Sequence, residues 1–116
     1  MPITLNTKSY ASYRTQADSN QLAGPANTVS TKDTITLRRQ FPKVTKDSAG
    51  VGRPGVKVVK TLTLGDGSRK DMIIDISGSV PAGAVEGDVL LVLDDAADFL
   101  ATQDAKDLFT KLDINA

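Results

Sequence analysis

Polar side chains that could bind a polyanion recur at alternate positions in two segments of the chain. DTITLRRQF, residues 33–41, interleaves threonine and arginine with apolar residues, and VKVVKTLTL, residues 56–64, interleaves lysine and threonine with apolar residues. Alternation of this kind is typical of a half-buried β-strand with one apolar and one polar face. Basic and hydroxyl groups side by side on a sheet can neutralise and hydrogen-bond phosphates. The plainer alternative is that threonine favours strands and lysine favours solvent, and both interpretations stay open here.

Enzyme chemistry has few possible participants, because the chain contains no histidine and no cysteine. Their absence removes the usual general bases, the partners of nucleophilic triads, disulfides and the common zinc ligands. We therefore predict a protein that is not an enzyme, with no catalytic residue, no metal site and no cofactor. No stretch approaches the roughly 20 apolar residues of a membrane span, so no membrane partner is expected.

The glycines at positions 50, 52 and 55 formally spell the dinucleotide-binding pattern GxGxxG. That pattern needs a helix directly afterwards, whereas the residues that follow here alternate like a strand, and Pro54 lies inside the motif. We interpret KVTKDSAGVGRPG, residues 43–55, as a mobile, exposed connection between strands.

Formal net charge is zero, but the charges are unevenly divided along the chain. Residues 1–70 hold twelve Lys or Arg and four Asp or Glu, a formal charge of +8, and residues 71–116 hold two and ten, a formal charge of −8. A basic half followed by an acidic half suggests that one structural layer meets a polyanion while another faces elsewhere. Two ordinary solvated surfaces are the alternative.

Turn signals organise the basic half into antiparallel strands. The tetrad GDGS, residues 65–68, favours a tight hairpin turn, because glycine and aspartate tolerate positive φ angles. It joins VKVVKTLTL to KDMIIDIS, in which apolar residues again alternate. The segments ITLN and SYASYR predict a short first hairpin, and QLAGPAN, residues 21–27, is interpreted as a turn-rich connection. Lys60 falls among the apolar positions of its strand, which suggests a bulge there.

The hydrophobic period changes after Pro81. Apolar residues then recur at helical spacing as far as Ala101, and Thr102 can cap a second, shorter helix. Acidic residues cover the other helical faces, and we interpret them as solvated rather than as magnesium ligands. Strands followed by helices predict an α+β fold, in which an N-terminal antiparallel sheet, built as a hairpin plus a meander, precedes two C-terminal α-helices. The acidic residues considered are Asp94, Asp95, Asp98, Asp104 and Asp107.

The order of these elements, together with particular residues, resembles the coat proteins of single-stranded RNA bacteriophages, the levivirus group. The ending is the most specific part, because a helix closing in FLA, a polar break and a short helix leading into KLDIN are similar to the family's own ending. The likeness covers nearly the whole chain and rests on collinear order. The segments that carry it are the ITLN hairpin, DTITLRRQFPK, VKVVKTLTL, DMIIDIS, SVPAG and ADFLATQDAKDLFTKLDINA.

The resemblance implies a single coat-protein domain over residues 1–116, with a sheet region at 1–80 and a helical dimerisation region at 81–116. It implies that the two helices pack across a dimer partner and that homodimers assemble into an icosahedral, multi-subunit shell. It places the protein in the virion, made in the cytoplasm of a bacterial host. Dimer contacts are expected at Leu108, Phe109 and Leu112, which follow helical spacing in the second helix.

The resemblance also implies that the sheet faces the particle interior and binds single-stranded genomic RNA. Such binding can include an operator hairpin, which couples packaging to translational repression. The RNA-binding residues carried over by strand position are Thr34, Thr36, Arg38, Lys57, Thr61 and Thr63. A two-fold dimer would present this set twice, as a continuous basic floor.

Aromatic residues are the point at which the sequence departs from the family pattern. Members with a well-defined operator stack a base on a tyrosine of the last strand, but DMIIDIS holds no aromatic residue. Tyr10 and Tyr13 in the first hairpin are the possible substitutes.

Two other classes of function compete with a shell protein. A small sheet-based RNA-binding regulator that never assembles would share the same charge division, and electron microscopy of the purified protein separates the two. An enzyme that uses carboxylates is disfavoured by the missing histidine and cysteine.

Overall fold

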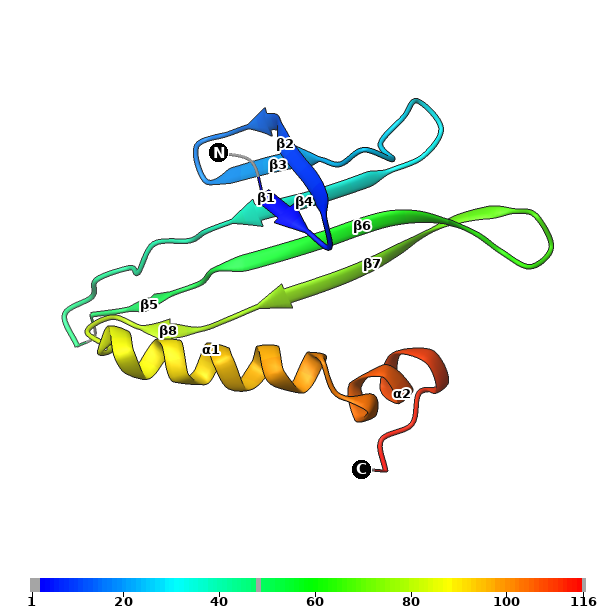
Figure 1. Cartoon of the computed structure of the whole chain (residues 1–116). Coiled ribbons are helices and arrows are strands. Elements are labelled where there is room, and N and C mark those ends of the chain that lie inside the picture. The colour runs from blue at the N-terminus through cyan, green and yellow to red at the C-terminus, as the bar shows by residue number, and fades with distance from the viewer. Residues whose placement is uncertain (1–2, 48, 116) are drawn as a thin grey trace. The chain divides into compact units, whose positions relative to one another are not determined.

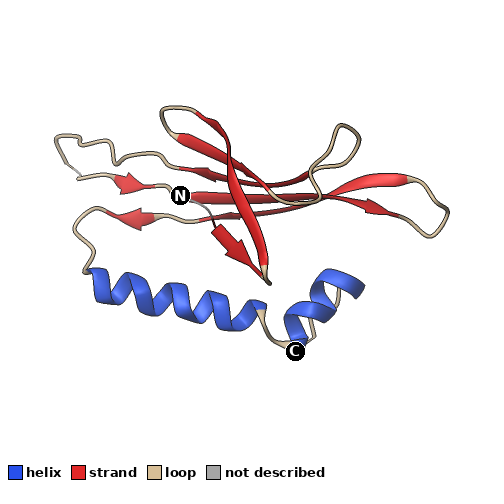
Figure 2. Cartoon of the chain, turned by 45° about the horizontal axis from the view of Figure 1, so that its top comes forward, coloured by secondary structure: helices blue, strands red, loops and turns tan. Residues whose placement is uncertain are grey.

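The computed structural model describes residues 3–47 and 49–115. The chain divides into two compact units, Met1–Ala82 and Gly83–Ala116. The first unit holds the strands and the second holds the helices (Figure 2). The sequence placed the change from sheet to helices after residue 80, and the first unit ends at Ala82.

The first unit is built on a six-stranded antiparallel sheet with the strand order β1-β2-β3-β4-β6-β7 (Figure 1). Neighbouring strands are also neighbours in the chain, except that the small strand β5 falls between β4 and β6. The predicted hairpin plus meander is therefore confirmed. The strands are β1 (Ile3–Leu5), β2 (Lys8–Thr15), β3 (Ser19–Ala23), β4 (Asp33–Arg38), β6 (Gly55–Thr63) and β7 (Arg69–Ser77).

The predicted first hairpin forms between β1 and β2, with Ile3 opposite Tyr10 and Leu5 opposite Lys8. Its turn places Asn6 and Thr7 at φ angles of 49° and 67°. Positive φ at both central residues is the geometry of the hairpin turns whose twist matches that of the flanking strands.

The segment QLAGPAN was predicted as a connection, but its first three residues belong to strand β3. Leu22 lies in this strand and is fully buried, with 0% of its surface exposed. The sequence pattern missed the strand because Leu22 is its only large apolar residue, so no alternation was visible. Packing against Tyr10 and Ile35 on the neighbouring strands supplies the stabilisation that local propensity does not.

The β6–β7 hairpin runs from Gly55 opposite Ser77 to Thr63 opposite Arg69 without a register shift. The bulge suggested at Lys60 is therefore absent. Lys60 stands opposite Asp33 of β4 and Met72 of β7, so it occupies a regular position in both ladders. The predicted GDGS turn is confirmed.

The β6–β7 turn is closed by its own side chains. Asp66 accepts hydrogen bonds from the backbone nitrogen and the hydroxyl of Ser68, at 3.0 and 2.6 Å. These two bonds hold the pKa of the Asp66 carboxyl below its ordinary value. Gly67 has a φ of 87°, which a residue with a Cβ adopts at a cost.

The core of the sheet is small. Among the described residues of the first unit, the buried hydrophobic side chains are those of Tyr10, Leu22 and Ile35. Ile3, Val56 and Val58 pack against this cluster while remaining partly exposed. A chain of this length with so little buried gains stability most readily by burying further apolar surface against another subunit.

The segment 43–55, predicted as an exposed connection, is partly structured. Residues 43–47 are exposed, and Ser48 lies outside the described residues. Strand β5 (Val51–Gly52) then pairs with β8 (Val80–Pro81). The residue after Gly55 continues strand β6, which confirms that no helix follows the glycine motif.

The second unit contains the two predicted helices, α1 (Glu86–Leu100) and α2 (Gln103–Lys111). Helix α1 is followed by Ala101 as its C-terminal cap, as expected from the sequence. The hydroxyl oxygen of Thr102 accepts a 3.2 Å hydrogen bond from the backbone nitrogen of Ala105, so Thr102 is the predicted N-cap of α2. Among the described residues, neither helix is long and apolar enough to cross a membrane.

Candidate nucleic-acid interface

The antiparallel register gives all six predicted RNA-binding residues the same face of the sheet. Directly opposed residues share a face, and Thr36 stands opposite Lys57 between β4 and β6. The buried cluster residue Ile35 stands opposite Val58 and therefore belongs to the other face. We call the first of these the polar face. On β4, β6 and β7 it comprises Thr34, Thr36, Arg38, Lys57, Val59, Thr61, Thr63, Arg69, Asp71, Ile73 and Asp75.

Five of the six predicted residues are accessible on this face. Thr36, Arg38, Lys57 and Thr61 are partly exposed, and Thr63 is exposed. Thr34 is 5% exposed, so its hydroxyl is not presented to solvent in the single chain. Direct contact with RNA is therefore open to the other five, whose role stays a prediction.

The polar face is not the continuous basic floor that the strand pattern suggested. Strand β7 adds two carboxylates, with Asp71 opposite Thr61 and Asp75 opposite Lys57. Both come from the acidic half of the sequence, because the change in charge at Lys70 falls inside the β6–β7 hairpin and not at the end of the sheet. The polar face of β6 and β7 therefore carries charges of both signs, and Lys57 stands opposite the carboxylate of Asp75.

Asp75 forms an ion pair with Arg38 on the polar face. Its Oδ1 atom lies 2.6 Å from Nη2 of Arg38, two strands away. Gly55 makes this reach possible, because it stands opposite Arg38 on β6, the strand that separates β4 from β7. A Cβ atom on Gly55 would lie 2.6 Å from the Cζ and Nε atoms of Arg38, so the guanidinium lies directly over this glycine.

Asp71 is held in a second network at the other end of the face. The Thr61 hydroxyl donates a 2.7 Å hydrogen bond to Asp71 Oδ1 and accepts one of 2.8 Å from the backbone nitrogen of Lys32. The Lys32 ammonium lies 3.4 Å from Asp71 Oδ2. The hydrogen bond from Thr61 and the charge of Lys32 hold the pKa of the Asp71 carboxyl below its ordinary value. The Thr61 hydroxyl is thus already engaged as both donor and acceptor.

The aromatic substitute proposed in the first hairpin is not available at Tyr10. Its side chain is 3% exposed, and its hydroxyl donates a 2.7 Å hydrogen bond to Oδ1 of the buried Asp33. Tyr10 belongs to the cluster on the other face of the sheet, so it cannot stack on a base bound at the polar face. The side chain of Tyr13 lies outside the described part of the structure.

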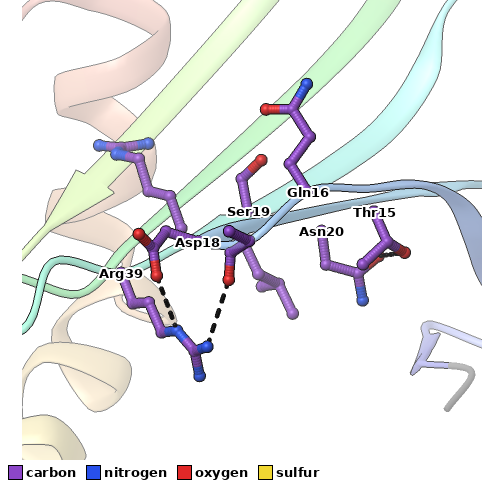
Figure 3. A pocket seen from close by; sticks show the side chains of 9 residues that line it. Thr15, Gln16, Asp18, Ser19, Asn20 and Arg39 are labelled. Atoms are coloured by element: carbon purple, nitrogen blue, oxygen red, sulfur yellow. Dashed lines mark hydrogen bonds and ion pairs between the residues drawn. The ribbon is translucent and has the colours of Figure 1, made fainter.

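An open pocket of about 310 Å³ lies where the β2–β3 turn meets the end of β4 (Figure 3). Arg39 Nε lies 3.3 Å from Asp18 Oδ1, and Arg39 Nη2 donates a 3.2 Å hydrogen bond to the Ala17 carbonyl. The guanidinium also stacks over the Phe41 ring, 4.7 Å from its centroid. Arg39 interrupts the sequence alternation because β4 ends at Arg38. Its partners come from a distant turn, so no local pattern could have identified them.

The second unit exposes most of its apolar side chains. No residue of α1 is buried in the single chain. Of the predicted dimer contacts on and after α2, Leu108 is partly exposed, Phe109 is 48% exposed and Leu112 is 84% exposed. Leu108 also lines a hollow of about 260 Å³ with Phe99 and Ile114. This unit therefore offers apolar surface that the described single chain leaves uncovered.

Strand β7 also has one unpaired edge among the described residues, because it bonds to β6 alone and ends the sheet order (Figure 1). It is nine residues long, and Met72, Ile73 and Ile76 on it are exposed. A long, apolar edge strand with free backbone donors and acceptors is a template for pairing with another chain.

Comparison with known proteins identifies the fold through structure rather than sequence. No protein-family model matches this chain, and no curated protein sequence matches it. The virus-like particle of Beihai levi-like virus 32 matches with a TM-score of 0.82 and 23% identity, over 96% of this chain and 91% of that chain. The virus-like particle of Wenzhou levi-like virus 4 matches with a TM-score of 0.75 and 25% identity, over 87% of this chain and 74% of that chain. The virus-like particle of bacteriophage GQ-907 matches with a TM-score of 0.79 and 17% identity, over 97% of this chain and 88% of that chain. The sheet followed by two helices is therefore the levivirus coat fold, and the resemblance drawn from the order of the sequence elements is confirmed.

Proposed function

We propose that this protein is the structural coat subunit of a small RNA bacteriophage, which forms homodimers that assemble into a shell around RNA. The observation that carries the proposal is the extent of the structural match. It spans 96% of this chain and 91% of a subunit taken from a virus-like particle. A likeness that includes both the sheet and the helices favours the assembling subunit over a protein that shares only a sheet.

Dimerisation is supported by surfaces that a single chain leaves uncovered. The exposed apolar residues of α1 and α2 would be buried against a second subunit in a homodimer. The free edge of β7 would add backbone hydrogen bonds by pairing with the same strand of a second copy. Because the strand would pair with itself, the interface would have two-fold symmetry, as most homodimers do.

Leu112 gives a second, independent reason to place α2 in the dimer interface. It is the C-terminal cap of α2 and has a φ of 56°, the left-handed region in which glycine and asparagine are the usual residues. An exposed leucine there costs about 1 kcal/mol of strain. A role at the interface would offset that cost, whereas solvent exposure would not.

The polar face would bind the genomic RNA. Lys57 and Arg38 supply charge for phosphates, and the hydroxyls of Thr36 and Thr63 are accessible for hydrogen bonds to RNA. In a two-fold dimer paired through β7, the two polar faces would form one surface. Recognition of an operator hairpin, with repression of translation, is the finer form of this proposal, and it would proceed without a tyrosine on β7.

Electron microscopy of the full-length protein expressed in bacteria tests assembly. We expect closed particles whose contents include RNA that resists added nuclease until the particles are opened. A uniform population of free dimers that bind RNA would instead favour the alternative, a small non-assembling RNA-binding regulator. A soluble monomer without RNA would contradict both functions.

Lysines on opposite faces of the sheet test where RNA binds. Lys57 lies on the polar face, whereas Lys70 stands opposite Leu62 on the other face, so Lys57→Ala and Lys70→Ala remove the same charge from opposite sides. We expect Lys57→Ala to reduce the slope of log affinity against log salt by about 0.7 to 0.9, the value for one phosphate contact. Lys70→Ala should leave the slope unchanged. Equal effects of the two substitutions would show that RNA is not held on the polar face.

A further inference from the structure

Among the described residues, Arg38 and Asp75 form the one ion pair whose two members both belong to the polar face. The Lys32–Asp71 pair lies at the border of this face, because Lys32 precedes β4. The paired atoms of Arg38 and Asp75 are 2.6 Å apart, yet 38% of the Arg38 side chain and 49% of the Asp75 side chain remain exposed. An RNA phosphate that approached the Arg38 guanidinium would therefore meet a carboxylate already bound to it.

Lys57 lies beside the same carboxylate, that of Asp75. Asp75 stands directly opposite Lys57 across β6 and β7, and directly opposed side chains lie within about 5 Å of one another at their Cβ atoms. One carboxylate thus lies beside both cations that the proposed function assigns to phosphate binding. Its charge opposes that of the phosphates that these cations would attract.

The geometry points to Asp75 as an internal competitor for RNA phosphate, which sets how tightly the polar face holds RNA of arbitrary sequence. This inference rests on the proposed function, since it concerns the same RNA-binding face. By occupying Arg38 in the free protein, Asp75 weakens contacts that any phosphate backbone could make. Base contacts then contribute a larger share of the binding free energy, and base contacts are what distinguish one RNA from another.

A purely structural role for this ion pair is disfavoured by its surroundings. Exposed ion pairs add little to stability, and the β6–β7 register runs from Gly55 to Thr63 without a shift. The three atoms nearest to a Cβ placed on Gly55 all belong to the Arg38 guanidinium. The Arg38–Asp75 pair is therefore expected to contribute little to the stability of the sheet.

Asp75→Asn tests the inference, with Asp66→Asn as the matched control. Both substitutions remove one negative charge from the β6–β7 hairpin, but Asp66 lies in its turn, bonded to Ser68. Binding of full-length protein to a non-cognate single-stranded RNA is measured by filter retention over a salt series. We expect Asp75→Asn to bind about fivefold to tenfold more tightly at low salt and to steepen the salt slope by about 0.7 to 0.9. Asp66→Asn should change affinity by less than about twofold.

The route through Arg38 is tested by combining substitutions. In an Arg38→Ala background, Asp75→Asn should increase the affinity for non-cognate RNA by a smaller factor than in the wild type. Only Lys57 is then freed from the carboxylate, because the variant has no Arg38 guanidinium to release. Gly55→Ala provides a variant with unchanged charge. The added methyl group would displace the Arg38 guanidinium from its position over residue 55, so this variant should also bind non-cognate RNA more tightly.

Two results would overturn the inference while leaving the proposed function intact. If Arg38→Ala weakens RNA binding but Asp75→Asn behaves like Asp66→Asn, the carboxylate does not compete. If Asp75→Asn weakens binding, Asp75 positions Arg38 for RNA instead of withholding it. Absence of RNA binding in the wild type and in every variant would contradict the proposed RNA-binding function, and this inference with it.

Discussion

Tyr10 and Asp33 are joined by a 2.7 Å hydrogen bond from the tyrosine hydroxyl to the carboxylate, although they lie 23 positions apart in the sequence. Both side chains are buried. The second carboxylate oxygen accepts a 3.2 Å hydrogen bond from the backbone nitrogen of Ala26. The pair thereby connects β2, the start of β4 and the loop that precedes β4. It is the polar centre of an otherwise apolar cluster.

This hydrogen bond makes folding sensitive to alkaline pH. Bonding to Asp33, with burial and the negative charge of Asp33, raises the pKa of Tyr10 from its ordinary value of 10.0 to about 12. Between these two values the unfolded chain loses the proton while the folded chain keeps it. The contribution of Tyr10 to stability is therefore complete below pH 10 and is lost as pH rises toward 12, by on the order of 2–3 kcal/mol. Urea unfolding at a series of pH values measures this loss.

Tyr10→Phe is the control for the pH experiment, because lysines also titrate in this range. The variant should be less stable at pH 8 by about 1–3 kcal/mol, since Asp33 loses a buried hydrogen-bond donor. It should also lose less stability than the wild type between pH 10 and 12. Parallel pH profiles of the two proteins would mean that the Tyr10 proton is not held by folding.

Gly24→Ala should destabilise the sheet, because Gly24 packs directly against the same pair. A Cβ atom at this position would lie 2.6 Å from Asp33 Oδ2 and would also collide with the Tyr10 ring. Neither neighbour can move freely, since both are buried. We expect a loss of about 1–3 kcal/mol in the free energy of unfolding. Gly65→Ala, in the β6–β7 turn of the same unit, is the matched control, because a Cβ atom there would have nothing within 4 Å. Equal stability of the two variants would contradict the close packing at Gly24.

Leu112→Asn separates a contact role from a capping role at the end of α2. Asparagine tolerates the left-handed conformation that Leu112 adopts, so the helix end should be retained, as checked by circular dichroism. If Leu112 is buried in the dimer, its loss should weaken dimerisation by about 1.5–3 kcal/mol, or roughly 10- to 100-fold in dissociation constant. Sedimentation at a series of concentrations measures this change. An unaffected or tighter dimer would leave Leu112 with a capping role alone.

Cysteine crosslinking tests how β7 pairs with a second copy of itself. An antiparallel pair centred on Met72 would set Arg69 opposite Asp75 of the second copy, whereas a pair centred on Ile73 would set Asp71 opposite Asp75. Opposite charges favour the first register and like charges disfavour the second. The chain has no native cysteine, so single variants report cleanly. Met72→Cys should form an inter-subunit disulfide under mild oxidation, whereas crosslinking of Ile73→Cys or Ile74→Cys instead would assign another register.

Local patterns in the sequence were sufficient for most of the elements. Alternation predicted β4, β6 and β7, the GDGS tetrad predicted the turn between the last two, and the change in period after Pro81 predicted both helices. These features depend on side-chain spacing and on the φ preferences of a few residues, which each segment carries by itself. The same alternation also gave the six predicted RNA-binding residues a common face.

Only the tertiary structure decided which of those polar residues are free to act. Strand β3 could not be recognised from its sequence, because its stability comes from the burial of Leu22 between neighbouring strands. Tyr10 is a core residue, because strand pairing places the carboxylate of the distant Asp33 within hydrogen-bonding distance of the tyrosine hydroxyl. Arg38 was interpreted from the sequence as a cation for phosphate binding, but the register places Gly55 opposite it, and the carboxylate of Asp75, two strands away, forms an ion pair with its guanidinium. The sequence therefore determined the elements and the faces of the strands, whereas strand pairing determined which charges meet, because electrostatic contacts depend on distances between residues that are remote in the chain.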